Sequence, residues 1–301
     1  MSDTSPPANV PISSSLWLLG GSMLLLQTIA GLCYPVAKYG LEMIDPFTFA
    51  FYRFVLSSVV LLSITRLIRR DPPIERKDWR KIALLGLLII PFNQTLFLVG
   101  QSLTGAGHGA FLFATTPVWI FILALIHLKE KATWRRVVGI VTATAGVGVI
   151  MFSGAIDFGT EYLAGDIIIL ISVVAWAYYT VLGKKLVEKY GAIRITAYSL
   201  AIGSTVYLPF GLIFAVQYDY SQATLAAWGS VAYMAIGLSV VVYVLWYWFL
   251  KQFDASRIAV YHNMQPVIAS AGAYFFLGEP LTTVFVIGGL AVLAGVIITE
   301  A

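Results

Sequence analysis

Amide and aromatic side chains occur inside apolar stretches of this sequence, where their chemistry suits contact with a small organic solute. Asn93, Gln94 and Phe97 fall at spacings that share one helical face. An amide without a partner in an apolar environment is costly, so these side chains should point into protein or water. Hydrogen bonds between helices would meet the same need, and the spacing alone does not choose between the two roles.

Aromatic residues recur at helical spacing in other apolar stretches. Tyr34 lies seven residues after Gln27, while Trp176 and Tyr179 are three residues apart on one helical face. Trp and Tyr near the ends of such stretches usually anchor a helix at the membrane surface, but these lie deeper, so we favour contact with a solute over packing alone. The predicted substrate-binding residues are Gln27, Tyr34, Asn93, Gln94, Phe97, Thr116, Trp176, Tyr179, Tyr243, Trp246, His262 and Gln265.

Two fixed positive charges lie within or at the end of apolar stretches. Arg53 is well inside its stretch, and Lys38 ends the first one. Buried cations are costly unless they are hydrated or paired. Arg53 could hold a carboxylate of a solute, but we favour a pair with Glu42 or Asp45.

Pro117 and Pro266 occupy matching positions in two apolar stretches, each preceded by polar residues. Proline removes a backbone donor and loosens the turn before it, which frees carbonyl groups. We predict that these prolines act as hinges, and a rigid kink without motion is the alternative.

Residues for covalent or metal chemistry are sparse. Cys33 is the single cysteine, and no Asp or Glu lies at the centre of an apolar stretch, so no metal or sodium site can be assembled. Histidine is the residue type whose unperturbed pKa lies near neutral pH, but for His108 and His262 a structural hydrogen-bonding role is the simpler interpretation. An intramembrane enzyme needs a nucleophile, a base and an orienting group within reach of each other. We therefore predict no enzyme, no catalytic residue, no metal and no cofactor.

The composition predicts the elements that position these residues. Hydrophobic residues make up 59% of the 301 positions and charged residues 11%, which excludes an ordinary soluble domain. An apolar run of about 20 residues spans a bilayer, and it must be helical because lipid offers backbone groups no partner. We predict an all-α integral membrane protein with ten transmembrane helices, at 16–38, 47–65, 82–101, 108–128, 135–153, 164–183, 195–216, 228–250, 258–277 and 282–299.

Lys and Arg residues are concentrated in alternate connections between these runs. Those connections hold 17 of the 19 basic residues, whereas the opposite loops hold acidic residues and no basic ones. Basic residues in short loops stay in the cytoplasm, so we predict an inner (plasma) membrane protein with both termini cytoplasmic. The same pattern explains the net charge of +4 without a nucleic-acid partner, although attraction to anionic membrane lipid is expected. Residues 1–15 contain no Lys or Arg and so do not resemble a cleavable signal peptide.

The sequence repeats itself after 149 residues. This offset aligns Trp79 with Trp228 and Pro117 with Pro266, and it continues in register into the last predicted helix of each half. Because each half would hold five helices, the second copy enters the membrane in the opposite sense, as in inverted-repeat transporters. The predicted divisions are a tail at 1–15, a first five-helix repeat at 16–153, an extracytoplasmic linker at 154–163 and a second five-helix repeat at 164–301.

Other repeated residues suggest packing rather than chemistry. Glu130 precedes Thr133 in a short loop, where a helix cap or a hinge explains the carboxylate better than catalysis. Glycines recur every two turns in the fifth helix of each half, and we expect close helix packing there. These glycines are Gly139, Gly146, Gly288 and Gly295.

The repeated segments also resemble a known family. WRKIALLGLL corresponds to WGSVAYMAIG, and LKEKATWRRVVGIVTATAGVGVIM corresponds to LGEPLTTVFVIGGLAVLAGVII. With the predicted spans, they make residues 16–299 similar to the drug/metabolite transporter (DMT) superfamily in its EamA-like branch. The resemblance implies a monomeric exporter fold, with a central cavity built from the first four helices of each half and the fifth helices packed outside. Cavity residues vary widely in such families, so the substrate does not carry over.

These patterns together predict a membrane transporter that exports small metabolites by alternating access. A cavity lined by aromatic and amide residues suits amino acids, aromatic or neutral, and related amphipathic solutes. A flippase for lipid-linked substrates is the alternative, and it would need a cavity that opens sideways to lipid. We expect a monomer whose partners are its small-molecule substrate and membrane lipid.

Overall fold

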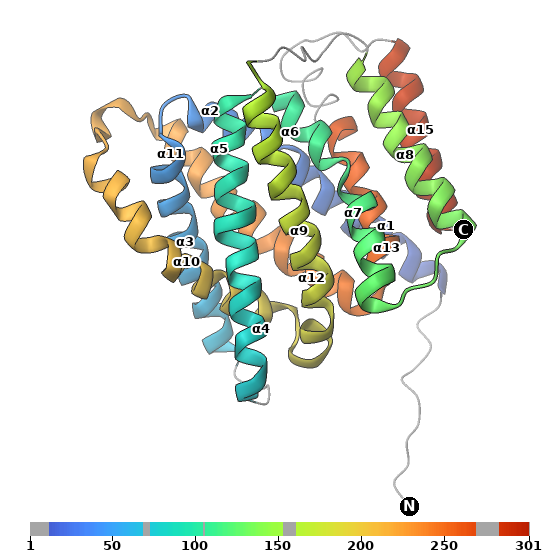
Figure 1. The fold of residues 1–301 in the computed structure, drawn as a ribbon, viewed down its shortest axis with the longest axis horizontal. Helices are drawn as coiled ribbons and strands as arrows, with labels where there is room; N and C mark the ends of the chain where they lie inside the picture. Colours follow the sequence, from blue (N-terminus) through green and yellow to red (C-terminus); the bar gives the residue numbers. More distant parts are fainter. Residues whose placement is uncertain (1–11, 69–72, 105, 153–160, 269–282, 301) are drawn as a thin grey trace, which may run out of the picture.

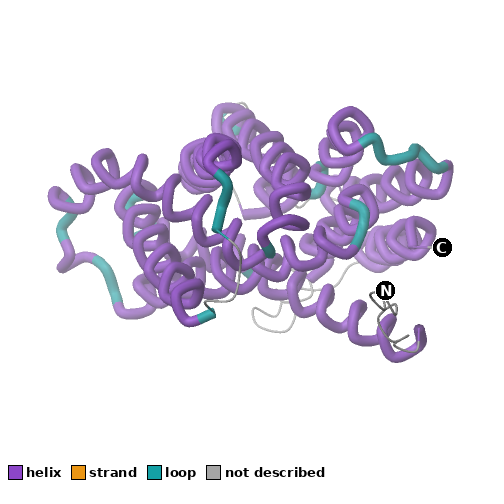
Figure 2. The backbone as a smooth tube through the Cα atoms, turned by 90° about the horizontal axis from the view of Figure 1, so that it is seen from below, coloured by secondary structure: helices purple, strands orange, loops and turns teal. Residues whose placement is uncertain are grey.

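The computed structural model describes residues 12–68, 73–104, 106–152, 161–268 and 283–300. Within these ranges the chain consists of helices joined by short connections, and no strand occurs (Figure 2). The α-helices are α1 (Ile12–Gly31), α2 (Cys33–Leu41), α3 (Pro46–Leu67), α4 (Arg76–Leu87), α5 (Leu96–Leu103), α6 (Ala106–Phe113), α7 (Thr116–Leu123), α8 (Trp134–Phe152), α9 (Leu163–Tyr190), α10 (Ala192–Gln217), α11 (Leu225–Ala232), α12 (Tyr243–Gln252), α13 (Ala255–Ala259) and α15 (Thr283–Glu300). The π-helices are η1 (Leu88–Thr95), η2 (Ala124–Leu128) and η4 (Tyr233–Val242), and the 3-10 helices are η3 (Tyr220–Gln222) and η5 (Val260–Asn263). The all-α prediction is therefore confirmed for the described residues.

Six helical stretches among the described residues are long and apolar enough to cross a membrane. They are Pro46–Leu67, Arg76–Leu103, Phe111–Leu128, Leu163–Tyr190, Ala192–Gln217 and Leu225–Gln252. All ten predicted ranges coincide with helix, some with one- or two-residue breaks, wherever the structure describes them. The later part of 258–277, from residue 269, lies outside the described residues. Length and composition thus support six crossings, and the other four stay a prediction.

Local sequence explains where α3 begins. The Asp45 carboxylate accepts hydrogen bonds from the backbone N–H groups of Phe47 and Thr48, both at 3.0 Å. Pro46 occupies the first turn, where the helix has no use for a backbone donor. Asp45 therefore satisfies N–H groups that would otherwise lack a partner at the start of an apolar helix.

The fifth helices of the two halves, α8 and α15, lie side by side at the edge of the bundle (Figure 1). A Cβ atom on Gly139 would lie 2.6 Å from the carbonyl oxygen of Gly295, and one on Gly146 would lie 2.7 Å from that of Gly288. The first glycine of each helix thus meets the second glycine of the other, so α8 and α15 are antiparallel. The predicted close packing is confirmed, because a side chain at these positions would collide with the neighbouring backbone.

The second helices of the two halves, α3 and α10, also run antiparallel. Ser58 and Ser204 share a hydrogen bond of 2.8 Å between their hydroxyl groups, and the Tyr207 hydroxyl donates to the carbonyl oxygen of Phe47 at 3.0 Å. Residues early in α3 thus contact residues late in α10. Two pairs of equivalent helices therefore run in opposite directions, as an inverted repeat requires.

The basic connections between helices meet at one end of the bundle. Lys184 Nζ lies 3.5 Å from Glu130 Oε1 and 3.8 Å from Asp254 Oδ1. Lys189 Nζ lies 2.8 Å from Asp78 Oδ2. These contacts involve the connections at 66–81, 129–136, 184–194 and 251–257, and we call this end of the molecule the basic end. Their convergence agrees with the alternating pattern of basic residues in the sequence.

Candidate functional site

A small cavity lies between the two halves of the chain, and we call it the central cavity. Its volume is about 40 Å³. A single water needs roughly 10–15 Å³ on this measure, so the cavity has room for a few waters and for no larger solute in this conformation. The lining residues are Leu26, Ala30, Cys33, Tyr34, Gln94, Phe97, Phe113, Trp176, Leu238, Val242, Tyr243, Trp246, His262 and Gln265.

Eight of the predicted substrate-binding residues line the central cavity. They are Tyr34, Gln94, Phe97, Trp176, Tyr243, Trp246, His262 and Gln265. Sequence reasoning missed the apolar part of the lining, because its residue types are those of any membrane helix. One signal was available: Leu26, Ala30 and Cys33 follow each other at helical spacing beside the predicted Tyr34.

Aromatic rings form one wall of the central cavity around Trp176. Its ring centre lies 5.1 Å from that of Tyr243 and 6.0 Å from that of Trp246. Trp246 in turn meets His262 edge-on, with ring centres 4.5 Å apart. The indole nitrogen of Trp176 and the hydroxyl of Tyr243 are buried without a hydrogen-bond partner among the described residues. The wall therefore offers stacking faces together with two polar groups that a solute could use.

Trp246 and Tyr179 are held by contacts outside the cavity. The indole N–H of Trp246 donates to the Thr180 hydroxyl at 3.1 Å. Tyr179 shares a hydrogen bond of 3.3 Å with Ser199 and stacks on Tyr247, with ring centres 4.8 Å apart. Tyr179 therefore faces α10 and α12. It does not line the central cavity, whereas Trp176, predicted on the same helical face, does.

A buried polar chain connects the first helices to the proline-containing segment of the second half. The Tyr34 hydroxyl donates to Gln265 Oε1, and Gln265 Nε2 donates to Gln27 Oε1, each at 2.8 Å. Gln27 thus stands behind the cavity wall, while Tyr34 and Gln265 form part of it. The side-chain amide of Gln265 is already oriented by both neighbours, so its position is well defined.

Arg53 anchors a second buried polar chain that crosses between the halves. Its Nε and Nη2 atoms each donate to the Ser239 hydroxyl at 3.1 Å, and Nη2 also donates to Gln94 Oε1. The predicted pair with Glu42 or Asp45 is wrong, because Asp45 caps α3 and Arg53 forms no ion pair among the described residues. The guanidinium points inward from α3 toward η1 and η4, away from the end where those acids lie.

Asn93 continues this chain toward the second half. Gln94 Nε2 donates to Asn93 Oδ1, and Asn93 Nδ2 donates to the backbone oxygen of Ser172 at 2.8 Å and to its hydroxyl at 3.1 Å. Asn93 is fully buried and lies behind the cavity wall. Asn93 therefore joins helices, Gln94 does so as well and also lines the central cavity, and contact with a solute stays a prediction.

Adjacent residues Asn93 and Gln94 both point inward because their backbone is π-helical. Residues 88–95 form the π-helix η1 with Pro91 inside it, and the equivalent stretch of the second half is the π-helix η4. A π-helix widens the turn, so that neighbouring residues which an α-helix would splay apart can share one face. The π-helical segments recur in both halves and adjoin the central cavity. They were not predicted from the sequence, because the 3.6-residue period used there is that of a regular α-helix.

The remaining predicted residues contribute to helix ends and breaks. Lys38 Nζ donates to the backbone oxygen of Thr104 at 2.9 Å, which places the cation at the end of α5, where carbonyl groups lack partners. Thr116 is buried but is not among the residues that line the central cavity, and Pro117 follows a break between α6 and α7. Pro266 lies in a short helical segment, 264–268, directly after the 3-10 turn η5. The helix is interrupted directly before Pro117, and the hinge role of both prolines stays a proposal.

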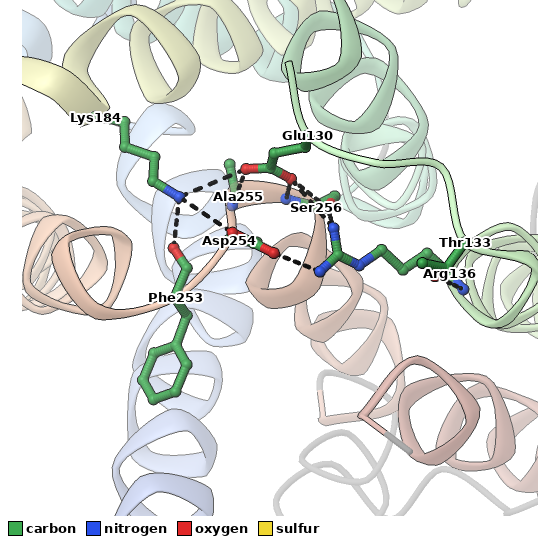
Figure 3. Close-up of polar contacts among 8 residues, drawn as sticks. All are labelled: Glu130, Thr133, Arg136, Lys184, Phe253, Asp254, Ala255 and Ser256. Atoms are coloured by element: carbon green, nitrogen blue, oxygen red, sulfur yellow. Dashed lines mark hydrogen bonds and ion pairs between the residues drawn. The ribbon is translucent and has the colours of Figure 1, made fainter. Parts of the chain in front are cut away.

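A charged cluster at the basic end joins the two halves (Figure 3). Glu130 accepts hydrogen bonds from the backbone N–H groups of Ala255 at 2.8 Å and Ser256 at 3.2 Å, so it caps α13 of the other half. Lys184 Nζ lies 3.5 Å from the same carboxylate, and Arg136 lies 3.7 Å from it. The predicted capping role of Glu130 is confirmed. Its repeat partner Glu279 lies outside the described residues.

A second group of contacts at the basic end joins the start of α4 to the end of α9. Lys189 pairs with Glu75 and Asp78, and the Tyr190 hydroxyl donates to Asp78 Oδ2 at 2.8 Å. The hydrogen bonds from Lys189 and then Lys77 lower the pKa of Glu75 below its ordinary value of 4.5. Two separate sets of contacts thus join the halves at the basic end.

The groups that line the central cavity can bind a solute through stacking and hydrogen bonds. Among the described residues, no group of three His, Cys, Asp or Glu side chains could hold a metal ion. Cys33 and His262 both line the cavity; the thiol is free, and His262 Nδ1 is buried without a hydrogen-bond partner among the described residues. The described side chain of His127 lies at the end of α7 and η2, at the basic end, and that of His108 lies outside the described residues. Aromatic faces and oriented amides are what the cavity presents to a solute.

Known proteins resemble this chain over nearly its whole length. The sequence profile of the EamA-like transporter family matches residues 17–152 and again residues 163–300. An uncharacterized transporter of Archaeoglobus fulgidus is 32% identical over 267 residues, covering 88% of this chain and 91% of the relative. A probable terminal-alkyne amino-acid exporter of Streptantibioticus cattleyicolor is 26% identical over 293 residues, covering 95% and 93%. A crystal structure with 15% identity superposes with a TM-score of 0.74, covering 93% of this chain and 98% of its own, which shows a shared fold.

Proposed function

The chain belongs to the EamA-like transporter family, and on this premise we propose that it exports small amphipathic metabolites, amino acids first among them, by alternating access. The observation that carries the proposal is the central cavity, which both halves line and whose volume is about 40 Å³. Such a cavity admits an organic solute only after the helices around it move apart. A binding site that must open and close is what alternating access requires.

The protein is a multi-pass membrane protein, and the finer topology belongs to the proposal. We propose ten crossings of an inner (plasma) membrane, with the basic end and both termini in the cytoplasm, in a monomer. The concentration of basic residues in four connections that meet at one end supports this orientation. The antiparallel packing of α8 with α15 supports an odd number of crossings in each half.

The lining of the central cavity supports an amphipathic solute. Trp176, Tyr243 and Trp246 provide stacking faces, while Gln94 and Gln265 provide oriented amides. The relative in Streptantibioticus cattleyicolor is named a probable terminal-alkyne amino-acid exporter, which agrees with such a solute without identifying it.

The two halves also contact each other at both ends of the helical bundle. At the basic end Glu130 bridges to Lys184, Ala255 and Ser256. At the opposite end the Tyr218 hydroxyl donates to the backbone oxygen of Met43 at 2.7 Å. Transport then consists of breaking one set of contacts while the other holds, with the breaks at Pro117 and Pro266 as flexing points.

Counterflow in proteoliposomes tests the proposed function. Vesicles loaded with one unlabelled amino acid or organic acid at a time should take up the matching labelled solute. Trp176→Ala should reduce exchange at least about tenfold, because it removes the ring at the centre of the aromatic wall. Trp134→Ala is the matched control, since Trp134 is 69% exposed at the start of α8. Exchange that Trp176→Ala leaves unchanged, or no exchange of any solute by the wild type, would overturn the proposal.

A further inference from the structure

Arg53 is a buried cation whose hydrogen-bonding capacity is only partly used. Its side chain is 0% exposed. Nε and Nη2 donate to Ser239 and Gln94, whereas Nη1 is buried with no hydrogen-bond partner among the described residues. A guanidinium presents its donors as a planar fork that matches a carboxylate with two parallel hydrogen bonds. One arm of that fork, Nη1, is vacant here, and the other is engaged by a neutral amide.

The charge of Arg53 has no protein counterion among the described residues. Its acceptors are a hydroxyl and an amide, and no ion pair involves it. An uncompensated cation inside an apolar helical bundle is strongly unfavourable. An anion that enters the bundle would therefore gain more from Arg53 than from any neutral group in the lining.

Arg53 adjoins the central cavity through residues that line it. Gln94 forms part of the cavity wall and accepts a hydrogen bond from Arg53 Nη2. The Tyr243 hydroxyl, which also lines the cavity, lies close to the guanidinium but is buried without a hydrogen bond of normal geometry among the described residues. Gln94 thus links the guanidinium of Arg53 directly to the central cavity.

We propose that Arg53 binds a carboxylate of the transported solute, through Nη1 and Nη2, and that the substrates are aromatic or other amphipathic solutes that carry one carboxylate, amino acids included. This inference rests on the proposed transport function and specifies the substrate class of the same cavity. On binding, the carboxylate replaces the Gln94 oxygen at Nη2 and supplies the absent partner of Nη1. The apolar body of the solute then lies against Trp176 and Tyr243.

The same lining discriminates against a positively charged amino group. No Asp or Glu of the described chain lines the central cavity. The ammonium group of a zwitterion must therefore rely on aromatic faces and on amide oxygens, which are weaker partners than a carboxylate. The expected order of affinity is a monocarboxylate first, then the matching zwitterion, then a neutral amide, with an amine last.

Four probes of similar size separate these charges in the wild-type protein. They are 3-phenylpropanoate, phenylalanine, 3-phenylpropanamide and 2-phenylethylammonium, and binding is followed by thermal stabilisation of the purified protein. A charge-assisted pair adds roughly 10- to 100-fold to affinity over a neutral hydrogen bond. We expect 3-phenylpropanoate to bind at least tenfold more tightly than the amide. Equal binding of the acid and the amide, or tighter binding of the amine, would refute the role of Arg53 without any variant.

Arg53→Gln should lower the affinity for 3-phenylpropanoate to that for the amide and leave amide binding unchanged, which also reports that the cavity is intact. Arg66→Gln is the matched control, since Arg66 is an exposed cation at the basic end of the same helix. Arg53→Lys keeps the charge but not the planar fork of donors. Its affinity for 3-phenylpropanoate should lie between those of the wild type and of Arg53→Gln. If Arg53→Gln fails to fold, the four probes on the wild type and on Arg53→Lys still decide whether Arg53 binds the carboxylate. Exchange and binding without charge preference would refute only the Arg53 assignment, whereas no binding or exchange of any probe would count against the proposed function itself.

Discussion

Replacing Glu130 with Gln should shift the protein toward a conformation that is open at the basic end. Glu130 caps α13 and lies between the cations Lys184 and Arg136. Its contacts with α13 and Lys184 join the first half to the second, and Arg136 holds the carboxylate from within the first half. Glutamine keeps one acceptor oxygen for the cap, but it removes the negative charge between two cations. The variant therefore weakens the closed basic end and leaves the opposite end unchanged.

The size of this shift follows from the burial of the three side chains. Glu130 is 6% exposed, Lys184 is 12% and Arg136 is 17%, so water screens the pairs only in part. Removing one partner of a fully buried pair costs roughly 3–5 kcal/mol, and loss of a cap costs about 1 kcal/mol. Because the separations of 3.5 and 3.7 Å are long and Gln retains part of the cap, we expect about 2 kcal/mol, which corresponds to roughly a 30-fold change in population.

Cys33 provides a direct assay of this opening. It is the only cysteine in the sequence, it is buried, and it lines the central cavity. A membrane-impermeant thiol reagent added to inside-out vesicles should modify Cys33 up to about 30-fold faster in Glu130→Gln than in the wild type, since reaction requires the cavity to open toward that face. In right-side-out vesicles the variant should react more slowly than the wild type.

The matched control for this experiment is Glu188→Gln. Glu188 lies on α9 near the same end, is exposed, and forms no ion pair among the described residues. It should leave the labelling rate of Cys33 unchanged from either face. Equal labelling rates for Glu130→Gln and the wild type would refute the idea that this cluster holds the basic end closed.

Two further predictions concern helix ends and packing. Asp45→Ala should destabilise the protein by about 1 kcal/mol in thermal unfolding, with Asp45→Asn close to wild type, because Asn can also cap α3; a full loss in the Asn variant would point to charge rather than capping. Gly139→Val should lower the unfolding temperature more than Gly21→Val, because a Cβ atom at Gly139 would collide with the Gly295 carbonyl, whereas nothing lies within 4 Å of a Cβ atom at Gly21; similar losses in both would contradict the packing of α8 on α15.

Helix positions and much of the cavity could be predicted from the sequence. Apolar runs fix the helical segments, since no other backbone is stable in lipid. The internal repeat then related Gln94 and Phe97 to Tyr243 and Trp246, and all four line the central cavity. The repeat was informative because equivalent positions in two inverted halves face the same interface.

Other parts of the site depend on tertiary contacts that spacing does not encode. Tyr179 shares a helical face with Trp176, yet it lies one turn further along, where α10 and α12 offer it Ser199 and Tyr247 instead of the cavity. The partners of Arg53 were wrong because sequence distance favoured nearby acids, whereas the buried guanidinium reaches a serine from the other half, Ser239. The π-helical turns were missed because a 3.6-residue period presumes a regular α-helix.

Protection of Cys33 by a transported solute tests most directly whether the central cavity is the binding site. Cys33 is modified in vesicles with increasing concentrations of a solute that shows counterflow, beside one of similar size that does not. We predict that the transported solute slows modification with the same half-saturation as counterflow, and that the other solute has no effect. Modification that proceeds at an unchanged rate while the solute saturates transport would contradict the account.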